Sequence, residues 1–441
     1  MRIAVIGTGH VGLPTAVSLA HLGHEVVACD CDPAKIEALK DGRAPFFEEG
    51  LDDLLAAELA SGRLAFSTDL TTAVAGAEVA FICVGTPPRA SGAANLLALE
   101  RVAEQIARAA TGDLVVVSKS TVPTGTADRL AETLARHGGG HSFTVVSSPE
   151  FLREGRAVED SLNPSRIVIG SDSPGGFAVL RAVYRPLLEA GVTYIETDIR
   201  TAELAKHASN AFLALKISYA NALARLCELS GADVVAVADI MGADHRIGRA
   251  HLDAGLGYGG YCFPKDLAAF SHLASELGYD FPLLAEVARL NDEAVEATIA
   301  KVRDALWNLE DKRVALLGLA FKPGTDDVRF SPALVLAERL ISEGARVVGY
   351  DPKAMAAAAT ELPGLELADD AYAALDGAHC AVVATDWEEF SELDLTKARA
   401  LMAFSIVIDG RNLFEPAAMA EAGFTYYPTG RPVVKPGFRR A

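Results

Sequence analysis

The first thirty residues constrain the fold most strongly. An apolar run at residues 3–6 leads into GTGHVG, with Gly7, Gly9 and Gly12, then an apolar stretch with helical spacing and a second apolar run that ends at Asp30. This order predicts a βαβ unit whose glycine turn holds a pyrophosphate at a helix N-terminus. Asp30 is predicted to accept from an adenosine ribose hydroxyl. Because its carboxylate would repel a 2′-phosphate, we expect NAD rather than NADP.

Further buried strands alternate with helices at residues 79–88, 114–125, 143–151 and 166–170. Such an alternation predicts a parallel, doubly wound sheet, whose ligands lie at the carboxyl ends of the strands. From residue 312 the pattern restarts, because RVALLGLAFKPGTDD followed by ARVVGYDP repeats the plan of the N-terminus without its glycine fingerprint. The fold class is therefore α/β, with two Rossmann-like doubly wound parallel-sheet domains.

Residues 200–230 contain no proline or glycine and predict one long helix that joins the two domains. It is apolar on more than one face, so we expect a homodimer formed through it. The predicted domains are 1–198, which binds NAD, 199–300, which is helical and dimerises, and 301–441, which binds a nucleotide sugar. Residues 428–441 hold four bases and no acid and are expected to form a mobile tail.

Composition excludes several classes of protein. The 59 acids and 40 bases give a net charge of −19, which argues against nucleic-acid binding. Apolar runs are all shorter than the roughly 18 residues that cross a bilayer, and the N-terminus lacks a secretory pattern. We expect a cytoplasmic protein without a membrane partner. The 6 cysteines form no disulfide or CxxC pattern, and no metal is expected.

The decapeptide GYGGYCFPKD at 257–266 is the most informative for chemistry. Its glycines allow tight turns and a close approach of substrate to Cys262. Lys265 and a helix that starts after Pro264 would favour the thiolate, which is the nucleophilic form. From these residues alone, a buried structural cysteine is an alternative, and Asp266 is no more than an acid at a helix start.

The chain resembles the UDP-glucose/GDP-mannose dehydrogenase family, whose members oxidise nucleotide sugars with NAD. The resemblance covers nearly the whole chain through segments in family order, which are GTGHVG, VGTPP, KSTVPTG, SSPEFLREG, LAKHASNAFLALKIS, DHRIG, GYGGYCFPKD, GLAFKPGTDDVRFSP and IDGRN. FPKD after the cysteine is most similar to members that convert UDP-glucose to UDP-glucuronate. The same reaction on dTDP-glucose, GDP-mannose or a UDP-N-acetylhexosamine is the alternative.

The resemblance implies a role for each catalytic residue. A C6 alcohol gives a hydride to NAD, and its proton passes to a base or water near Asp266 and Lys206. Cys262 then attacks the aldehyde, and Lys206 and Asn210 stabilise the oxyanion. After a second hydride transfer, Glu150, with Thr121 holding a water, resembles the general base that hydrolyses the thioester.

The resemblance also assigns binding residues. The cofactor set is Gly7, Gly9, His10, Val11, Gly12, Asp30, Lys35, Val84, Gly85, Thr86, Ser120, Thr121, Glu154, Lys265 and Arg329. The substrate set is Glu150, Phe151, Leu152, Arg153, Glu154, Lys206, Asn210, Arg246, Tyr258, Gly259, Cys262, Phe321, Lys322 and Arg411. Arg246 resembles the arginine that the family inserts into the neighbouring subunit's site.

Some positions depart from the family pattern. Tyr261 stands where a small residue usually precedes the cysteine, Phe330 replaces an acid or polar residue, and the segment after GTPP lacks an Asp-Gly pair. These changes leave the identity of the nucleotide base and of the sugar open.

Two other interpretations of the function are a two-electron hydroxyacid dehydrogenase, which needs neither the cysteine nor a second sheet, and a catalytically silent dinucleotide-binding or scaffolding protein. Retention of Cys262, Lys206, Asn210, Glu150 and Asp266 argues against the silent protein.

Overall fold

The computed structural model describes residues 1–437 and divides the chain into two units. The first consists of residues 1–209 and 268–279, and the second begins at 210 and contains the remaining residues. The long helix and a shorter one each contribute to both units, so this division does not test the three predicted domains, which remain a prediction.

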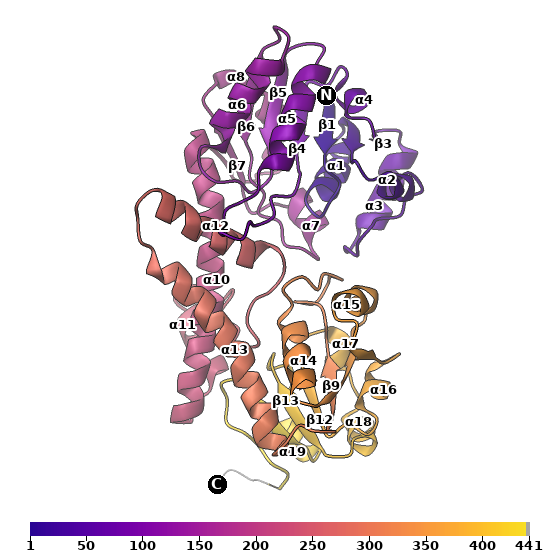
Figure 1. The fold of residues 1–441 in the computed structure, drawn as a ribbon, viewed down its shortest axis with the longest axis vertical. Coiled ribbons are helices and arrows are strands. Elements are labelled where there is room, and N and C mark those ends of the chain that lie inside the picture. The colour runs from indigo at the N-terminus through magenta and orange to yellow at the C-terminus, as the bar shows by residue number, and fades with distance from the viewer. Residues whose placement is uncertain (438–441) are drawn as a thin grey trace. The chain divides into compact units, whose positions relative to one another are not determined.

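The first unit is built on one eight-stranded sheet in the order β3-β2-β1-β4-β5-β6-β7-β8, with helices on its faces (Figure 1). Its strands are β1 (Arg2–Ile6), β2 (Glu25–Cys29), β3 (Leu64–Ser67), β4 (Val79–Ile82), β5 (Leu114–Ser118), β6 (Phe143–Ser147), β7 (Ile167–Ser171) and β8 (Tyr194–Thr197). All neighbours are parallel except β6 and β7, which pair Val146 with Ser171 and Ser147 with Gly170 in antiparallel register. The chain enters β7 from the carboxyl end of β6, so the predicted parallel pattern stops there.

The helices of this unit cover the apolar strands and leave the carboxyl edge to loops. They are α1 (Gly12–His21), α2 (Pro33–Lys40), α3 (Leu51–Ala60), α4 (Leu70–Val74), α5 (Leu97–Ala109), α6 (Thr126–His137), α7 (Ala157–Leu162), α8 (Pro174–Val183) and α9 (Arg185–Glu189). Because β1, β4, β5 and β6 are parallel, the loops GTGHVG, VGTPP, KSTVPTG and SSPEFLREG all begin at the same edge of the sheet. This edge brings together the N-terminal site residues predicted from the sequence.

The second unit contains a parallel six-stranded sheet in the order β11-β10-β9-β12-β13-β14. Its strands are β9 (Arg313–Leu317), β10 (Arg346–Tyr350), β11 (Glu366–Leu367), β12 (Cys380–Val383), β13 (Ile406–Asp409) and β14 (Thr425–Pro428). Its flanking helices are α14 (Pro332–Ser342), α15 (Met355–Glu361), α16 (Ala371–Leu375), α17 (Glu388–Ser391), α18 (Leu395–Leu401) and α19 (Pro416–Glu421). The internal repeat seen in the sequence is therefore a second doubly wound sheet, as predicted.

Four helices complete the chain, namely α10 (Ile199–Ser230), α11 (Val234–Gly242), α12 (Cys262–Glu276) and α13 (Pro282–Leu306). The long helix α10 has 32 residues and confirms the helix predicted at 200–230. Across residues 1–437, no helix combines the length and the apolar character needed to span a bilayer.

The prediction of a mobile tail is wrong for residues 428–434. Arg431 Nε donates to Asp233 Oδ2 at 3.0 Å, and Tyr426 and Val434 exchange backbone hydrogen bonds of 2.9 and 3.1 Å. These bonds hold the chain in place as far as Val434, because the Arg431 side chain and the Val434 backbone both bond to groups of the second unit. Residues 438–441 lie outside the described part of the chain.

Candidate active site

The glycine turn after β1 has the geometry that a dinucleotide requires. Gly7 has φ +97°, and a Cβ there would lie 2.8 Å from the Cys83 carbonyl oxygen. A Cβ on Gly12 would lie 1.8 Å from the Gly7 carbonyl oxygen, whereas nothing lies within 4 Å of a Cβ placed on Gly9. The first and third glycines are thus required by the protein's own packing, and the second leaves open space beside the backbone. These are the three roles that a pyrophosphate-binding turn assigns to its glycines.

Asp30 lies at the end of β2, beside this turn. One oxygen, Oδ2, accepts from Thr8 N–H at 3.0 Å, Thr8 Oγ1 at 2.9 Å and Lys35 Nζ at 3.0 Å, while Oδ1 accepts from Asp32 N–H at 3.1 Å. Burial raises the pKa of Asp30, but the bonds from Thr8 and Lys35 outweigh it, so the pKa is below its ordinary value. The carboxylate is therefore charged and fixed, and Oδ1 has capacity left for a ribose hydroxyl.

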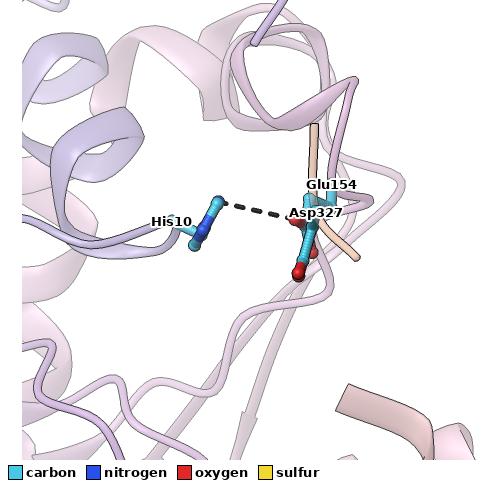
Figure 2. A group of neighbouring side chains, drawn as sticks. All are labelled: His10, Glu154 and Asp327. Atoms are coloured by element: carbon cyan, nitrogen blue, oxygen red, sulfur yellow. Dashed lines mark ion pairs between the residues drawn. The ribbon is translucent and has the colours of Figure 1, made fainter. Parts of the chain in front are cut away.

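His10 connects the glycine turn to the segment after β6. Its Nδ1 lies 3.5 Å from Glu154 Oε1, and Figure 2 marks this ion pair with a dashed line. The His10 ring also packs on Phe46, with ring centroids 4.1 Å apart. Two residues predicted from different motifs thus meet in the first unit.

The loops after β4 and β5 bond directly to each other. Ser120 Oγ donates to the Val84 carbonyl at 2.7 Å, and Thr86 Oγ1 donates to the Thr121 carbonyl at 2.9 Å. The predicted cofactor residues of VGTPP and KSTVPTG therefore form one bonded group. Only the main chain of Thr121 takes part in these contacts.

Lys206 and Glu150 form a buried ion pair. Lys206 Nζ lies 2.9 Å from Glu150 Oε1, and both residues are less than one-tenth exposed. Glu150 Oε2 accepts from Leu152 N–H at 2.6 Å. Lys206 Nζ also lies 5.4 Å from the centroid of the Phe151 ring, which the Arg166 guanidinium approaches at 3.7 Å. Since buried charges are costly unless paired, this pair fixes both side chains in one geometry.

A second buried polar group lies in the second unit around Asp266. Its Oδ2 accepts from Asn210 Nδ2 at 2.6 Å, and its Oδ1 from Lys265 Nζ at 2.5 Å. Asp266 is 1% exposed. The sequence placed Asn210 and Asp266 in one site, and the structure joins them through one hydrogen bond, with Lys265 as a third member that compensates the charge.

Cys262 is the first residue of α12 and is exposed, so this helix begins before Pro264 and not after it as predicted. The positive end of the helix dipole favours a thiolate at this position. The alternative of a buried structural cysteine does not hold for this residue. Asp266 lies one helical turn further along α12, so its buried contacts anchor the turn that carries the thiol.

The glycines before Cys262 are enclosed by protein. A Cβ on Gly257 would lie 2.6 Å from Asn291 Oδ1, one on Gly259 would lie 2.4 Å from the Phe330 carbonyl oxygen, and one on Gly260 would lie 2.7 Å from the Phe321 ring. Asn291 also accepts from Tyr258 N–H at 2.7 Å and donates to the Tyr258 carbonyl at 3.0 Å. Close packing within the second unit therefore accounts for the glycines that the sequence suggested were for substrate approach.

Tyr261, a departure from the family pattern, has two cations near its ring. Its ring centroid is 4.6 Å from the Arg329 guanidinium and 5.7 Å from Lys265 Nζ. Arg329 is in turn paired with Asp327, with an NH2–Oδ2 distance of 2.6 Å. Burial raises the pKa of Tyr261. Two residues that the sequence assigned to the cofactor therefore lie near the ring of Tyr261.

The predicted substrate arginines have protein partners. Arg153 NH2 pairs with Asp160 Oδ1 at 2.6 Å, and Arg246 NH2 pairs with Asp244 Oδ2 at 2.5 Å while its side chain is 78% exposed. Arg411 donates to the carbonyls of Ala384 at 2.7 Å and Phe321 at 3.2 Å. Lys322 Nζ lies 5.7 Å from the Phe321 ring centroid. Arg411 therefore joins loops at the carboxyl edge of the second sheet.

Sequence reasoning missed residues that hold these loops through backbone contacts. Asn291 holds Tyr258, Glu48 accepts from Gly155 N–H at 2.8 Å and Ala157 N–H at 2.6 Å, and Glu203 and His207 of α10 contact the KSTVPTG loop. His207 lies within the LAKHASNAFLALKIS segment but was given no role, and the other three lie outside the segments that carry the family resemblance. For Glu203 and His207 the available signal was an acid or a histidine within an otherwise apolar helical stretch.

Comparisons with known proteins agree with this arrangement. The models of the UDP-glucose/GDP-mannose dehydrogenase family match the NAD binding domain at residues 1–188, the central domain at 200–293 and the UDP binding domain at 315–416. A UDP-glucose 6-dehydrogenase of Rhizobium meliloti is 45% identical, covering 98% of this chain and 100% of the relative.

Solved structures show the same fold. A UDP-glucose dehydrogenase from Pyrobaculum islandicum has a TM-score of 0.91 and 39% identity, covering 98% of each chain. A UDP-D-ManNAc dehydrogenase from Pyrococcus horikoshii has a TM-score of 0.85 and 30% identity, covering 98% of this chain and 99% of that one. With the glycine turn, Asp30 and the second sheet, these matches show that the chain is an NAD-dependent dehydrogenase and belongs to the UDP-glucose/GDP-mannose dehydrogenase family.

Proposed function

We propose that this enzyme oxidises the C6 hydroxyl of UDP-glucose to the carboxylate of UDP-glucuronate in a four-electron reaction. The observation that carries the proposal is the pairing of an exposed Cys262 at the start of α12 with a buried Asp266 one turn later, bonded to Asn210 and Lys265. A two-electron dehydrogenase needs no such cysteine. NAD bound at the glycine turn would supply the hydride acceptor for the first oxidation, and a second NAD molecule would supply it for the second.

In the first oxidation the C6–H bond gives its electron pair as hydride, and the hydroxyl proton passes to a base or water near Asp266 and Lys206. The product is a bound aldehyde. We propose that Asp266 takes part in this proton transfer. It is buried, and its contacts with Asn210 and Lys265 hold the carboxylate in one orientation.

Cys262 then adds to the aldehyde carbon as thiolate, which forms a carbon–sulfur bond and places a negative charge on the former carbonyl oxygen. Lys206 and Asn210 are proposed to donate to this oxygen. Both are more than nine-tenths buried, so donors of this kind need little reorganisation at the moment of reaction. Loss of the second hydride from this adduct leaves a thioester.

Hydrolysis releases the acid. Water adds to the thioester carbon, the carbon–sulfur bond breaks, and the thiol of Cys262 is regenerated. Glu150 is proposed as the general base and Thr121 as the residue that holds the water. The support for Glu150 is its fixed geometry, since one oxygen faces Lys206 and the other the Leu152 N–H. The ion pair with Lys206 holds this acceptor in one buried position.

The substrate is proposed to lie with its nucleotide at the second sheet, against Phe321, Lys322 and Arg411, and its sugar near the FLREG segment and the 258–262 loop. The remaining assignments of cofactor and substrate residues made from the sequence are part of the same proposal, as are the three parts 1–198, 199–300 and 301–441. The same reaction on a UDP-N-acetylhexosamine is the alternative, and the likeness to a UDP-D-ManNAc dehydrogenase favours testing it.

A homodimer through α10 is also proposed. Phe212, Tyr219 and Leu226 are 61%, 48% and 60% exposed and follow one another at intervals of seven residues, so they share one helical face. Leu229 and Ile240 add exposed apolar surface at 83% and 75%. Such a contiguous apolar face is typical of a subunit interface. Arg246 would then reach the partner's site. A cytoplasmic location, where NAD and nucleotide sugars are supplied, belongs to the same proposal.

The test is the number of NADH molecules formed per UDP-glucose with NAD in excess, with dTDP-glucose, GDP-mannose and a UDP-N-acetylhexosamine in parallel. We expect about two NADH per UDP-glucose, because each oxidation releases one hydride. One NADH would overturn the four-electron reaction, and activity with another sugar alone would replace the substrate.

A Cys262→Ala variant sharpens the test. It is expected to form no acid, because no thioester can form. Cys227→Ala is a matched control, because Cys227 is buried away from the proposed chemistry. Acid production by Cys262→Ala would contradict the covalent mechanism.

A further inference from the structure

The segment between β5 and α6 is held at two points by one helix. Glu203 of α10 accepts from Gly125 N–H through Oε2 at 2.7 Å and from Ala127 N–H through Oε1 at 3.0 Å. His207, one turn later, contacts the Val122 carbonyl oxygen through Nε2 at 3.0 Å. A ring nitrogen facing a carbonyl carries the hydrogen, so His207 is the donor.

These contacts replace a missing cap. Helix α6 begins after Gly125, which has φ +91° and no side chain to accept from the first N–H groups. Such N–H groups need partners, usually a side chain at the N-cap. Glu203 supplies both acceptors from a different helix, so the start of α6 depends on the position of α10.

The same turn of α10 also holds the proposed hydrolytic base. Lys206 lies between Glu203 and His207 in the sequence, and its Nζ pairs with Glu150 Oε1 at 2.9 Å. Successive residues on a helix point in different directions, so one turn of α10 contacts the Thr121 loop through two side chains and the Glu150 segment through a third.

We propose that Glu203 and His207 are positioning residues that fix Thr121 relative to the Lys206–Glu150 pair for thioester hydrolysis. The proposal rests on the function proposed above and adds a residue pair that acts only through the backbone of residues 122–127. Thr121 directly precedes Val122, so a shift of this segment moves Thr121 with it.

The burial of the Glu203 carboxyl group supports a functional role for this side chain. It is 2% exposed, and His207 is 1% exposed. Burial raises the pKa of Glu203 to about 7, against the lowering effect of the Gly125 and Ala127 bonds. The charged groups that act on it are Asp128 of α6, which raises the pKa, and Arg200 of α10, which lowers it. A buried acid that is costly to ionise and yet doubly bonded is typical of a functional region.

The central experiment measures thioester hydrolysis in Glu203→Gln. The glutamine has the same shape, but its amide nitrogen cannot accept from an N–H, so one of the two bonds is lost. We expect the NADH burst to persist while hydrolysis slows by about tenfold or more, since small misplacements of catalytic groups have effects of this size. Acylated enzyme should therefore accumulate and be visible by intact mass spectrometry.

Three variants control the result. His207→Phe removes the donor to Val122 and should slow the same step, whereas His207→Gln keeps a donor and should recover part of the rate. Arg200→Gln breaks an exposed contact between the same two helices, in which Arg200 NH2 bonds Asp128 Oδ2 at 2.9 Å. We expect this variant to retain wild-type hydrolysis within about twofold, because exposed ion pairs contribute little.

Hydrogen exchange separates the positioning role from the reaction itself. In Glu203→Gln, the amides of residues 122–127 should exchange faster than in the wild type, with those of β5 unchanged. Wild-type hydrolysis and unchanged exchange in Glu203→Gln would overturn the proposal, as would equal slowing of both hydride steps and hydrolysis. A wild-type enzyme that forms no thioester would instead refute the proposed function, while the exchange result would still report whether the two side chains hold this segment.

Discussion

The two doubly wound sheets start from the same local plan and end in different chemistry. After β1, Gly7 N–H bonds the Cys29 carbonyl at 2.7 Å, and after β9, Gly318 N–H bonds the Tyr350 carbonyl at 2.8 Å. Both glycines have φ +97°. Each second strand is followed at once by an aspartate, Asp30 or Asp351.

The environments of the two aspartates differ. Asp351 is 1% exposed and accepts from five donors, the N–H groups of Leu319, Ala320, Lys353 and Ala354 and the Trp387 Nε1–H. Asp30 accepts from Thr8, Lys35 and Asp32, and only one of these bonds is made by Oδ1. An acid whose oxygens are filled by its own chain cannot bind a ribose.

The turns differ in the same sense. In the first unit α1 begins at Gly12, and Gly9 leaves open space beside the backbone. In the second unit α14 begins only at Pro332, and the counterpart of Gly9, two residues after Gly318, is Ala320, which is fully buried and whose N–H donates to Asp351 Oδ2 at 3.0 Å. The comparison teaches that one strand–turn–strand plan binds a dinucleotide only where the acid and the turn keep unfilled capacity.

The largest expected effect comes from exchanging the two aspartates for alanine. Asp351→Ala leaves five donors without their acceptor, and we expect unfolding to become easier by about 4 kcal/mol with unchanged NAD affinity in the folded fraction. Asp30→Ala should lower stability less and weaken NAD binding by about tenfold or more, because a charge-assisted bond to the ribose is lost. Urea unfolding and calorimetric titration with NAD measure the two quantities. Weaker NAD binding by Asp351→Ala, at full folding, would contradict the comparison.

The next largest effect is the pH dependence of the free energy of unfolding, which we expect to arise in the first unit. The loop after β9 is held by hydroxyls, since Thr385 Oγ1 donates to the Ala320 carbonyl at 2.6 Å and Ser331 Oγ to the Leu319 carbonyl at 2.7 Å. The loop after β5 is held by the hydroxyls of Ser120 and Thr86 and, in addition, by the buried carboxylate of Glu203. Burial raises the pKa of Glu203 to about 7. A raised pKa means that the folded state binds the proton more tightly, so stability falls as pH rises from the unfolded value to about 7 and is then constant.

We expect this group to account for up to about 3 kcal/mol of that fall. The measurement is the difference in unfolding free energy between wild type and Glu203→Gln over this pH interval. The variant cannot titrate there, so its curve should be flatter. Parallel curves would show that Glu203 has an ordinary pKa in the folded protein.

The smallest effect is at Tyr261, which lies in the second unit beside Cys262. Tyr261→Ser introduces a small residue and removes the ring that Arg329 and Lys265 approach. Contacts of this kind contribute about 1 kcal/mol, so we expect KM for NAD to rise about fivefold with kcat little changed. Tyr261→Phe retains the ring and should behave as wild type. A fall in kcat with constant KM would place the ring near the reacting atoms instead.

The sequence predicted the fold well because its signals are local. Apolar strands, the glycine turn and the unbroken stretch of α10 can each be identified from neighbouring residues alone. The repeat that begins at residue 312 predicted the second sheet. The antiparallel pairing of β6 with β7 was not predictable, because it depends on where the intervening chain returns to the sheet.

The candidate site was predicted less completely. Residue types suited to chemistry, such as Cys262 and Lys206, stand out in a sequence, whereas Glu203, His207 and Asn291 act on backbone groups that every residue has. The arginines are a different case. Their positive charge suggested substrate contacts, which remain a prediction, and the structure adds that Arg153 and Arg411 also bond to groups of the protein itself.

The enclosure of the loop before Cys262 limits how this enzyme can change over evolutionary time. Gly257, Gly259 and Gly260 are each blocked by a different atom of the second unit. A substitution at any one of them would need its own compensating change elsewhere, so we expect single substitutions at these positions to be poorly tolerated. Tyr261 is only partly enclosed. New preferences for cofactor or sugar can therefore arise at Tyr261 while the path of the chain that presents the thiol stays fixed.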